Sequence, residues 1–287
     1  MNTLKEITEH IGILPSKISK LINYPDRHYI PFFIPKKNGE KREIFKPKFS
    51  LKIVQRWILV KILRPLPLTE SAVAYIKKSN GLIKNTIPHL GKKFLLKLDL
   101  ENFFESITQD QVSSVFGRIQ SLDSQTIKDL TSLTTYQGTL KQGSVTSPTL
   151  SNLVFHPIDE KILDYCKQNK LSYTRYADDI SVSANDETSL REAESVIKKL
   201  ITENGFKLNQ SKCKLLPPNS LKIITGININ HAKPLIPKRR RKRIRAKIHK
   251  LFIEAKPDKF INMVKGEISY INSIDSTYLD RTRIYFK

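Results

Sequence analysis

A pair of short β-type segments, joined by only three residues, constrains the fold of this chain most strongly. Leu171–Tyr176 and Ile180–Ala184 flank the tripeptide Ala177–Asp179. Because so short a connection leaves no room for a crossover, the two segments are predicted to form an antiparallel hairpin. Such a hairpin holds two adjacent carboxylates near its tip. A third apolar segment, Phe94–Asp99, also ends in a carboxylate.

The rest of the chain is predicted to consist mainly of amphipathic helices. Apolar residues recur at helical spacing in several stretches, and a hairpin and a further strand lie between them. The predicted helices are 4–22 (interrupted at Pro15), 50–64, 109–133, 148–164, 188–204 and a C-terminal tail, with a hairpin over 29–47 and a strand over 221–229. Because helices and short strands do not alternate as regular βαβ units, the predicted fold class is α+β.

The charge of the chain indicates a polyanionic partner. Fifty Lys and Arg residues against 27 Asp and Glu residues leave a formal net charge of +23, which favours nucleic acid binding. A membrane is disfavoured, because the longest unbroken apolar run, Ala72–Ile76, is far shorter than the roughly 20 residues that span one. With no apolar signal-peptide segment and only Cys166 and Cys213, the predicted location is a reducing cytoplasm.

Asp99 and the pair Asp178 and Asp179 are candidate metal ligands. If the strand that ends at Asp99 lies beside the hairpin, the three carboxylates converge. Without a counter-charge they would repel each other, whereas Mg²⁺ prefers oxygen ligands of this kind. Two such ions can catalyse phosphoryl transfer. Taken alone, however, an Asp at a strand end is usually a cap or turn residue, and an Asp-Asp pair in a turn is most often solvated.

Four segments resemble motifs of reverse transcriptases. Tyr176–Asp179 is similar to the YxDD box of that family. Leu98–Phe104, with its Leu-Asp and Phe-Phe pairs, resembles the first palm motif, and Gln142–Pro148 resembles the QGxxxSP loop. These three motifs occur in the order in which the family carries them. Ile34–Arg42 is similar to the basic hairpin of the fingers.

Two further segments resemble bacterial retron reverse transcriptases in particular. Asn85–His89 is similar to their NAxxH signature, with Thr86 in place of Ala. Ile224–Gly226 is similar to their VTG signature, with Ile in place of Val. From this resemblance Asn85, His89, Thr225 and Gly226 are expected to contact RNA.

The resemblance implies a right-hand polymerase fold. Residues 1–90 would form the fingers with an N-terminal helix, and residues 91–230 the palm, an antiparallel sheet plus helices. Part of the fingers would lie between about residues 109 and 140 of that span, and residues 231–287 would form a short, basic, helical thumb. Asp99, Asp178 and Asp179 would hold two Mg²⁺ ions and serve as the catalytic carboxylates.

The same resemblance implies four nucleotide-binding residues. Arg42 would bind the triphosphate of an incoming dNTP, with Lys36 nearby as a point charge. Phe104 would crowd a ribose 2′-OH and so select deoxynucleotides, whereas Phe103 is expected in the core. Gln142 would contact the nucleotide from its loop.

A basic run near the C-terminus is expected to dock RNA. Nine of the 13 residues from Lys238 to Lys250 are Lys or Arg, and none is acidic. Ile244, Ile248 and Leu251 form an apolar stripe at helical spacing, so one face is predicted to pack on protein while the other follows phosphates. The side chains assigned to the phosphates are Arg240, Arg241, Arg243 and Lys247. A solvated basic face is the alternative.

The function implied by the resemblance is RNA-directed DNA polymerisation in a retron. Members of that family copy part of their own structured non-coding RNA from a guanosine 2′-OH, which gives branched RNA–DNA, and often act with an effector protein in anti-phage defence. The expected partners are therefore this RNA, its DNA product, dNTPs and an effector. The alternatives are a group II intron-like or abortive-infection-type reverse transcriptase, and a non-catalytic RNA-binding protein.

Overall fold

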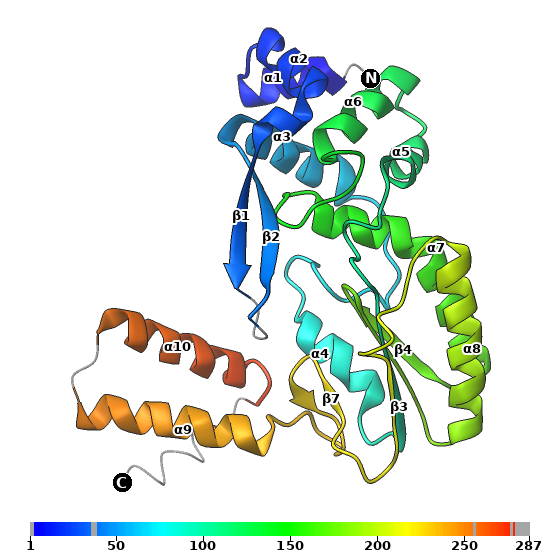
Figure 1. The fold of residues 1–287 in the computed structure, drawn as a ribbon, viewed down its shortest axis with the longest axis vertical. Helices are drawn as coiled ribbons and strands as arrows, with labels where there is room; N and C mark the ends of the chain where they lie inside the picture. The colour runs from blue at the N-terminus through cyan, green and yellow to red at the C-terminus, as the bar shows by residue number, and fades with distance from the viewer. Residues whose placement is uncertain (1–2, 36–38, 255–256, 276–277, 279–287) are drawn as a thin grey trace.

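The computed structural model describes residues 3–35, 39–254, 257–275 and 278, and a four-stranded sheet lies at its centre (Figure 1). The strand order is β4-β5-β3-β6, and every pairing is antiparallel. The strands are β3 (Phe94–Asp99), β4 (Ser172–Tyr176), β5 (Asp179–Ala184) and β6 (Lys214–Leu216). The predicted hairpin is confirmed as β4-β5, and β3 lies directly beside it.

The register of the sheet brings the end of β3 to the tip of the hairpin. Asp99 stands opposite Asp179, and the Leu100 N–H donates to the Asp178 carbonyl at 3.0 Å. Ala177 has a φ of 58°, in the left-handed region, which reverses the chain within the turn. The sheet therefore places the predicted acidic segments next to each other.

Two long helices pack on the sheet. α7 (Ser147–Gln168) contacts β4, and α8 (Glu187–Glu203) contacts β3 and β5. α8 buries Leu190, Ala193, Ile197 and Ile201 completely, and their spacing of three or four residues is the apolar stripe that predicted this helix. Both predicted helices are confirmed, and α7 is longer than predicted.

α7 continues through Pro157. A proline has no N–H to donate to the carbonyl four residues before it, so the Leu153 carbonyl lacks its helical partner. Arg118 Nη1 donates to that carbonyl at 3.4 Å. A side chain from a neighbouring segment therefore replaces the missing helical hydrogen bond.

Most of the other helices that precede α9 lie near a second hairpin, at the top of Figure 1. We call everything that precedes α9 the body. Asp123 starts a new helix by accepting from the Thr126 N–H at 2.8 Å, so the helix predicted over 109–133 is two helices. The break predicted at Pro15 is confirmed. The elements are α1 (Thr3–Ile11), α2 (Pro15–Asn23), η1 (Pro25–His28), β1 (Tyr29–Pro35), β2 (Lys41–Pro47), α3 (Phe49–Ile58), the π-helical η2 (Leu59–Leu63), α5 (Gln109–Gly117) and α6 (Ser124–Thr134).

Two further short helices and a small hairpin lie at the opposite end of the body. They are α4 (Gly81–Thr86), η3 (Ile87–His89), β7 (Ile223–Ile224) and β8 (Ile227–Asn228). The single strand predicted over 221–229 is therefore wrong. Thr225 and Gly226 have φ values of 45° and 84°, so the chain turns back between β7 and β8.

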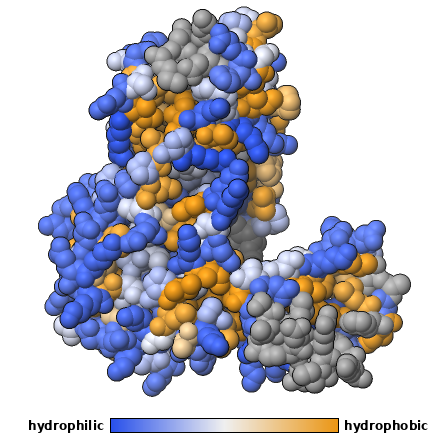
Figure 2. All heavy atoms as spheres, turned by 180° about the vertical axis from the view of Figure 1, so that it is seen from behind, coloured by the Kyte–Doolittle hydropathy of each residue, from blue (hydrophilic) through white to orange (hydrophobic). Residues whose placement is uncertain are grey.

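The C-terminal helix pair, α9 (Lys238–Ile253) and α10 (Asp258–Asn272), has a hydrophobic core of its own. That core includes Ile244, Ile248 and Val264, whereas one continuous cluster joins the helical region to the sheet. Figure 2 shows the pair projecting from the base of the upright body. Within the described ranges, no helix is both long and apolar enough to cross a membrane.

Candidate active site and nucleic-acid interface

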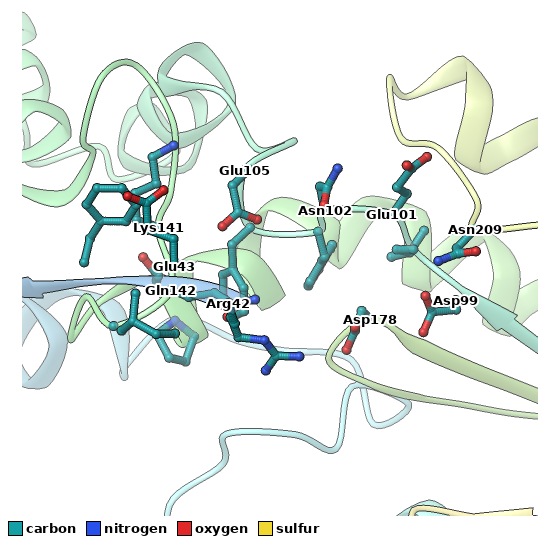
Figure 3. Close-up of a pocket in the computed structure, with 18 of the residues that line it drawn as sticks. Arg42, Glu43, Asp99, Glu101, Asn102, Glu105, Lys141, Gln142, Asp178 and Asn209 are labelled. Carbon is teal, nitrogen blue, oxygen red and sulfur yellow. The ribbon is translucent and has the colours of Figure 1, made fainter. Parts of the chain in front are cut away.

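A cleft of about 1020 Å³ lies between the β1-β2 hairpin and the end of the sheet. Five of the residues assigned from the sequence line it, and they come from β2, from β3 and the residues that follow it, from the 141–148 loop and from the β4-β5 turn (Figure 3). These residues are Arg42, Asp99, Phe104, Gln142 and Asp178. Segments far apart in the sequence therefore meet in one cavity.

Asp99 and Asp178 supply the carboxylates of the cleft. Asp99 is 8% exposed, and Lys212 Nζ donates to its two oxygens at 2.8 and 3.1 Å. Burial raises the pKa of Asp178, and the negative charges of Asp179 and Asp99 raise this pKa further. Two partly buried carboxylates on adjacent segments are a donor set that fits a divalent cation.

Asp179 lies outside the lining of this cleft. Its carboxylate is 3.8 Å from Lys97 Nζ, two residues before Asp99 on β3, and 39% of its side chain is exposed. No group of three or more acidic, His or Cys side chains suited to a metal occurs among the residues that the structure describes. Asp99 and Asp178 therefore line the cleft, whereas the Asp179 carboxylate lies beside Lys97, and the assignment of all three as metal ligands stays a prediction.

The hairpin and the 141–148 loop form the opposite wall. Arg42 is exposed on β2, and Figure 3 shows its guanidinium directed toward Asp178. The Phe45 N–H donates to the Gln142 carbonyl at 2.8 Å, which fixes the loop against β2. Gly143 has a φ of 103°, and a Cβ there would lie 2.6 Å from Ile44 Cγ2. Only glycine allows this close approach of loop and strand.

Phe104 forms an aromatic wall together with Tyr75. Phe104 is 9% exposed, and its ring centroid lies 6.4 Å from that of Tyr75. Burial raises the pKa of Tyr75 to about 12, so this phenol stays neutral. Phe103 packs edge-on against Phe155 in the core, as predicted. Lys36 lies outside the described residues.

Sequence reasoning missed several residues of the cleft. Lys212 pairs with Asp99, and Glu43, Glu105 and Lys141 line the wall near Arg42. Lys212 follows α8 in a polar loop, and only the pairing of β6 with β3 brings that loop to Asp99. No local pattern in the sequence predicts this long-range pairing.

Asn85 and His89 are buried, which corrects the expectation that they contact RNA. They are 1% and 0% exposed. His89 Nδ1 lies 2.7 Å from Ser183 Oγ, and its Nε2 lies 2.8 Å from Thr174 Oγ1. Thr174 also donates to the Asn85 side-chain oxygen at 2.7 Å. These side chains therefore attach α4 and η3 to the strands of the β4-β5 hairpin.

Burial of His89 predicts a pH-dependent stability. Burial lowers the pKa of His89 from 6.5 to about 3, so the unfolded chain binds a proton below pH 6.5 that the folded chain does not. The contribution of His89 to stability is therefore complete above pH 6.5 and falls by roughly 1.4 kcal/mol per pH unit below it. Urea unfolding of wild type and His89→Gln between pH 7.5 and 5 should show a steeper loss for wild type. Equal slopes would contradict the assignment.

Only some of the basic side chains of α9 are exposed to solvent. Arg240 and Lys247 lie four and three residues from Ile244, so they share the face of the apolar stripe. The Arg240 guanidinium lies 3.9 Å from the centroid of the Tyr270 ring, and Lys247 Nζ donates to Glu267 at 2.8 Å. The Arg241 carbonyl accepts from Tyr278 at 3.3 Å.

These contacts correct the predicted phosphate-binding set. Of its four members only Arg243 is exposed, whereas Arg240, Arg241 and Lys247 are half-buried. The other exposed basic residues, on the face opposite the stripe, are Lys238, Arg239, Lys242 and Lys250. We call these four and Arg243 the outer basic face. Thr225 and Gly226 lie against Tyr270 and Arg240, and their contact with RNA stays a prediction.

The profile of the family described as reverse transcriptase (RNA-dependent DNA polymerase) matches residues 34–229. The retron Ec86 reverse transcriptase of Escherichia coli is 33% identical over 278 residues, which cover 96% of this chain and 86% of that protein. The retron Ec83 reverse transcriptase of Escherichia coli is 30% identical over 270 residues, which cover 90% of this chain and 86% of that protein.

Among solved structures, the telomerase of Candida albicans in complex with a TWJ fragment of telomeric RNA matches with a TM-score of 0.52 at 14% identity. The match covers 95% of this chain but only 56% of the telomerase chain. At this identity the likeness concerns the fold alone, and it supports the predicted α+β polymerase fold. From the family profile and the retron relatives together, the chain belongs to the reverse transcriptase family of RNA-directed DNA polymerases, and within that family to the retron type.

Proposed function

We propose that the chain reverse-transcribes part of its own structured non-coding RNA, starting from a guanosine 2′-OH, and so makes branched RNA–DNA (multicopy single-stranded DNA). The observation that carries the catalytic part is the cleft in which Asp99 and Asp178 face Arg42. The likeness to retron reverse transcriptases supports the choice of template. The net charge of +23 fits a chain that holds both RNA and DNA.

The three parts of the right-hand fold follow from the same proposal. Residues 1–90, with part of 109–140, form the fingers, and residues 91–230 form the palm. Residues 231–287 form the thumb. Packing of α6 against α2 and α3 supports counting the 109–140 segment with the fingers. The separate hydrophobic core of α9 and α10 supports the thumb as a unit of its own.

Each residue of the cleft then has a role in DNA synthesis. Asp99 and Asp178 would hold Mg²⁺, which lowers the pKa of the attacking hydroxyl and neutralises charge on the phosphates. Arg42 binds the triphosphate of the dNTP with two parallel hydrogen bonds. Gln142, held by its carbonyl to β2, orients the nucleotide, and Phe104 excludes a 2′-OH.

A polymerisation assay tests the proposal. The purified chain, given Mg²⁺, dNTPs and a primed RNA template, should extend the primer, and the nucleic acid that copurifies from its host should contain a 2′-branched guanosine. A group II intron-like enzyme would synthesise DNA without the branch. A non-catalytic RNA-binding protein would bind the RNA without making DNA.

The outer basic face is proposed to dock that RNA. Changing Arg239, Lys242, Arg243 and Lys250 to Gln removes up to four phosphate contacts, and each contact releases about 0.7–0.9 counterion. The slope of log K against log salt should therefore decrease by up to roughly three to four units. Filter binding of the cognate RNA from 50 to 300 mM salt measures this slope.

Matched loss of charge elsewhere serves as the control for the outer basic face. Lys161, Lys167, Lys170 and Arg191 are exposed on α7, on α8 and just beyond α7, outside the cleft lining. Their change to Gln lowers the net charge by the same four units and should leave the slope near its wild-type value. If both quadruple variants change the slope equally, the effect comes from overall charge and the docking assignment is wrong.

Anti-phage defence with an effector protein, in the bacterial cytoplasm, completes the proposal. Cys166 and Cys213 are free thiols, which suits a reducing compartment. Phage plating on cells that carry the whole locus, with and without Asp178→Asn in this chain, tests the role in defence. Equal plating efficiency would remove defence from the proposal and leave the polymerase in place.

A further inference from the structure

Arg175 is the largest fully buried side chain of the described protein, and it lies directly behind the cleft. It precedes Asp178 by three residues, at the end of β4. A buried charge is costly even when it is paired, and an apolar side chain of similar size often gives equal stability. The contacts of Arg175 therefore point to a role beyond stability.

The guanidinium joins α7 to the turn that carries Asp178. Its Nε and Nη2 donate to the two oxygens of Asp159 at 2.9 and 2.5 Å. Its Nη1 donates to the Ala177 carbonyl at 3.0 Å. Ala177 has a left-handed φ, so this hydrogen bond holds the turn in the conformation that directs Asp178 into the cleft.

The same guanidinium also acts on the aromatic wall. Nη1 donates to the Asn152 side-chain oxygen at 3.2 Å, and Asn152 Nδ2 donates to the Ala74 carbonyl at 2.9 Å. The Val73 N–H donates to the Arg175 carbonyl at 3.0 Å, which fixes the same segment from its other side. Tyr75 follows at once, with a φ of 65°.

We propose that Arg175 is a positioning residue that sets the cleft's acidic and aromatic walls together: Asp178 through Ala177, and Tyr75 through Asn152. The planar guanidinium presents its donors in a fixed fork: Nε and Nη2 bind Asp159 on α7, and this leaves Nη1 placed to donate to Ala177 for one wall and to Asn152 for the other. A lysine could neutralise Asp159 but could not donate to Asp159, Asn152 and Ala177 in this geometry. The inference rests on the proposed active site and adds the residue that assembles it.

Two substitutions test the acidic wall and the aromatic wall separately. Arg175→Lys keeps the charge but releases the turn, so kcat should fall roughly ten- to hundredfold and Mg²⁺ binding, measured by calorimetry, should weaken. Asn152→Ala releases the Ala74 carbonyl and removes one acceptor of Arg175 Nη1, which keeps its hydrogen bond to Ala177. The KM for dNTP should therefore rise severalfold while kcat and Mg²⁺ binding stay near wild type. A purely structural role would lower the melting temperature without this division between kcat and KM.

Tyr173→Phe is the matched control. Tyr173 donates to Asp159 at 2.5 Å in the same buried network, but it has no contact with the turn or with the segment before Tyr75 among the hydrogen bonds of the described chain. It should lower stability and leave kcat, KM and Mg²⁺ binding unchanged per folded molecule. If Arg175→Lys and Asn152→Ala behave like this control, the positioning role is wrong. If Arg175→Lys does not fold, the kcat and KM values of Asn152→Ala decide.

The wild-type and Asp178→Asn chains distinguish failure of this inference from failure of the proposed function. An inactive wild type would remove the polymerase assignment, and the positioning role with it. An active wild type, an inactive Asp178→Asn and an unaffected Arg175→Lys would contradict the positioning role alone.

Discussion

Replacing Asp178 by Asn should reduce DNA synthesis about a thousandfold or more, with little change in fold or RNA binding. An amide keeps the shape of the side chain but loses the charge that pairs with a divalent cation, and such a cation contributes several kcal/mol to phosphoryl transfer. Because burial and neighbouring carboxylates disfavour the ionised form of Asp178, removing its charge costs no folding stability. Single-turnover primer extension measures the rate, and circular dichroism verifies the fold.

Two further Asp variants make this test specific. Asp164→Asn, at an exposed position on α7 outside the cleft lining, should leave the rate unchanged. Asp179→Asn should cost less than Asp178→Asn, because Asp179 pairs with Lys97 and does not line the cleft. Activity of Asp178→Asn within tenfold of wild type would remove the metal assignment. Equal losses for Asp178→Asn and Asp179→Asn would show that the three-carboxylate cage forms when the cation binds.

Replacing Phe104 by Val should lower the preference for dNTP over rNTP about a hundredfold. The ring of Phe104 lines the cleft beside Tyr75, and a smaller side chain leaves room for a 2′-OH that the ring excludes. The quantity measured is the ratio of kcat/KM for dATP and ATP on one primed template. The absolute rate with dATP should change far less than the ratio.

Phe103 is the control for Phe104. It is the adjacent residue, but its ring packs on Phe155 and Phe206 in the core. Phe103→Leu should therefore lower the melting temperature and keep the dNTP preference. If the ratio is unchanged in Phe104→Val and that variant is folded, Phe104 is only a core residue and sugar selection has another cause.

Local patterns predicted the parts of this structure that depend on neighbours in sequence. The three-residue connection between the apolar strands can form only a tight hairpin, so Asp178 was placed at its tip correctly. The stripe of α8 and the break at Pro15 follow equally from local spacing and backbone chemistry. The motifs around Asp99 and Gln142 predicted that both segments lie at the active site, and both residues line the cleft.

The parts that could not be predicted depend on contacts between distant residues. Lys212 reaches Asp99 only because β6 pairs with β3, and Lys97 neutralises Asp179 only in that sheet. His89 lies between Pro88 and Leu90, and nothing in the local sequence shows that Ser183 and Thr174 enclose it. For α9, the helical spacing in the sequence would have been enough to place each basic residue on the correct face. However, the prediction assigned Arg240 and Lys247 outward, although they lie on the same helical face as Ile244.

The hydrophobic cluster of α9 and α10 is separate from the clusters of the sheet and of the helical region. Polar contacts between the helix pair and the rest of the described chain include Asn80 Nδ2 to the Ser273 carbonyl at 3.1 Å and the Tyr270 hydroxyl to the Thr225 carbonyl at 3.4 Å. Because its core is its own, we expect the helix pair to separate from the rest at a lower free energy than global unfolding costs. If the outer basic face docks RNA as proposed, such a separation would admit a folded RNA from the side, without threading its end, while the catalytic cleft stays intact.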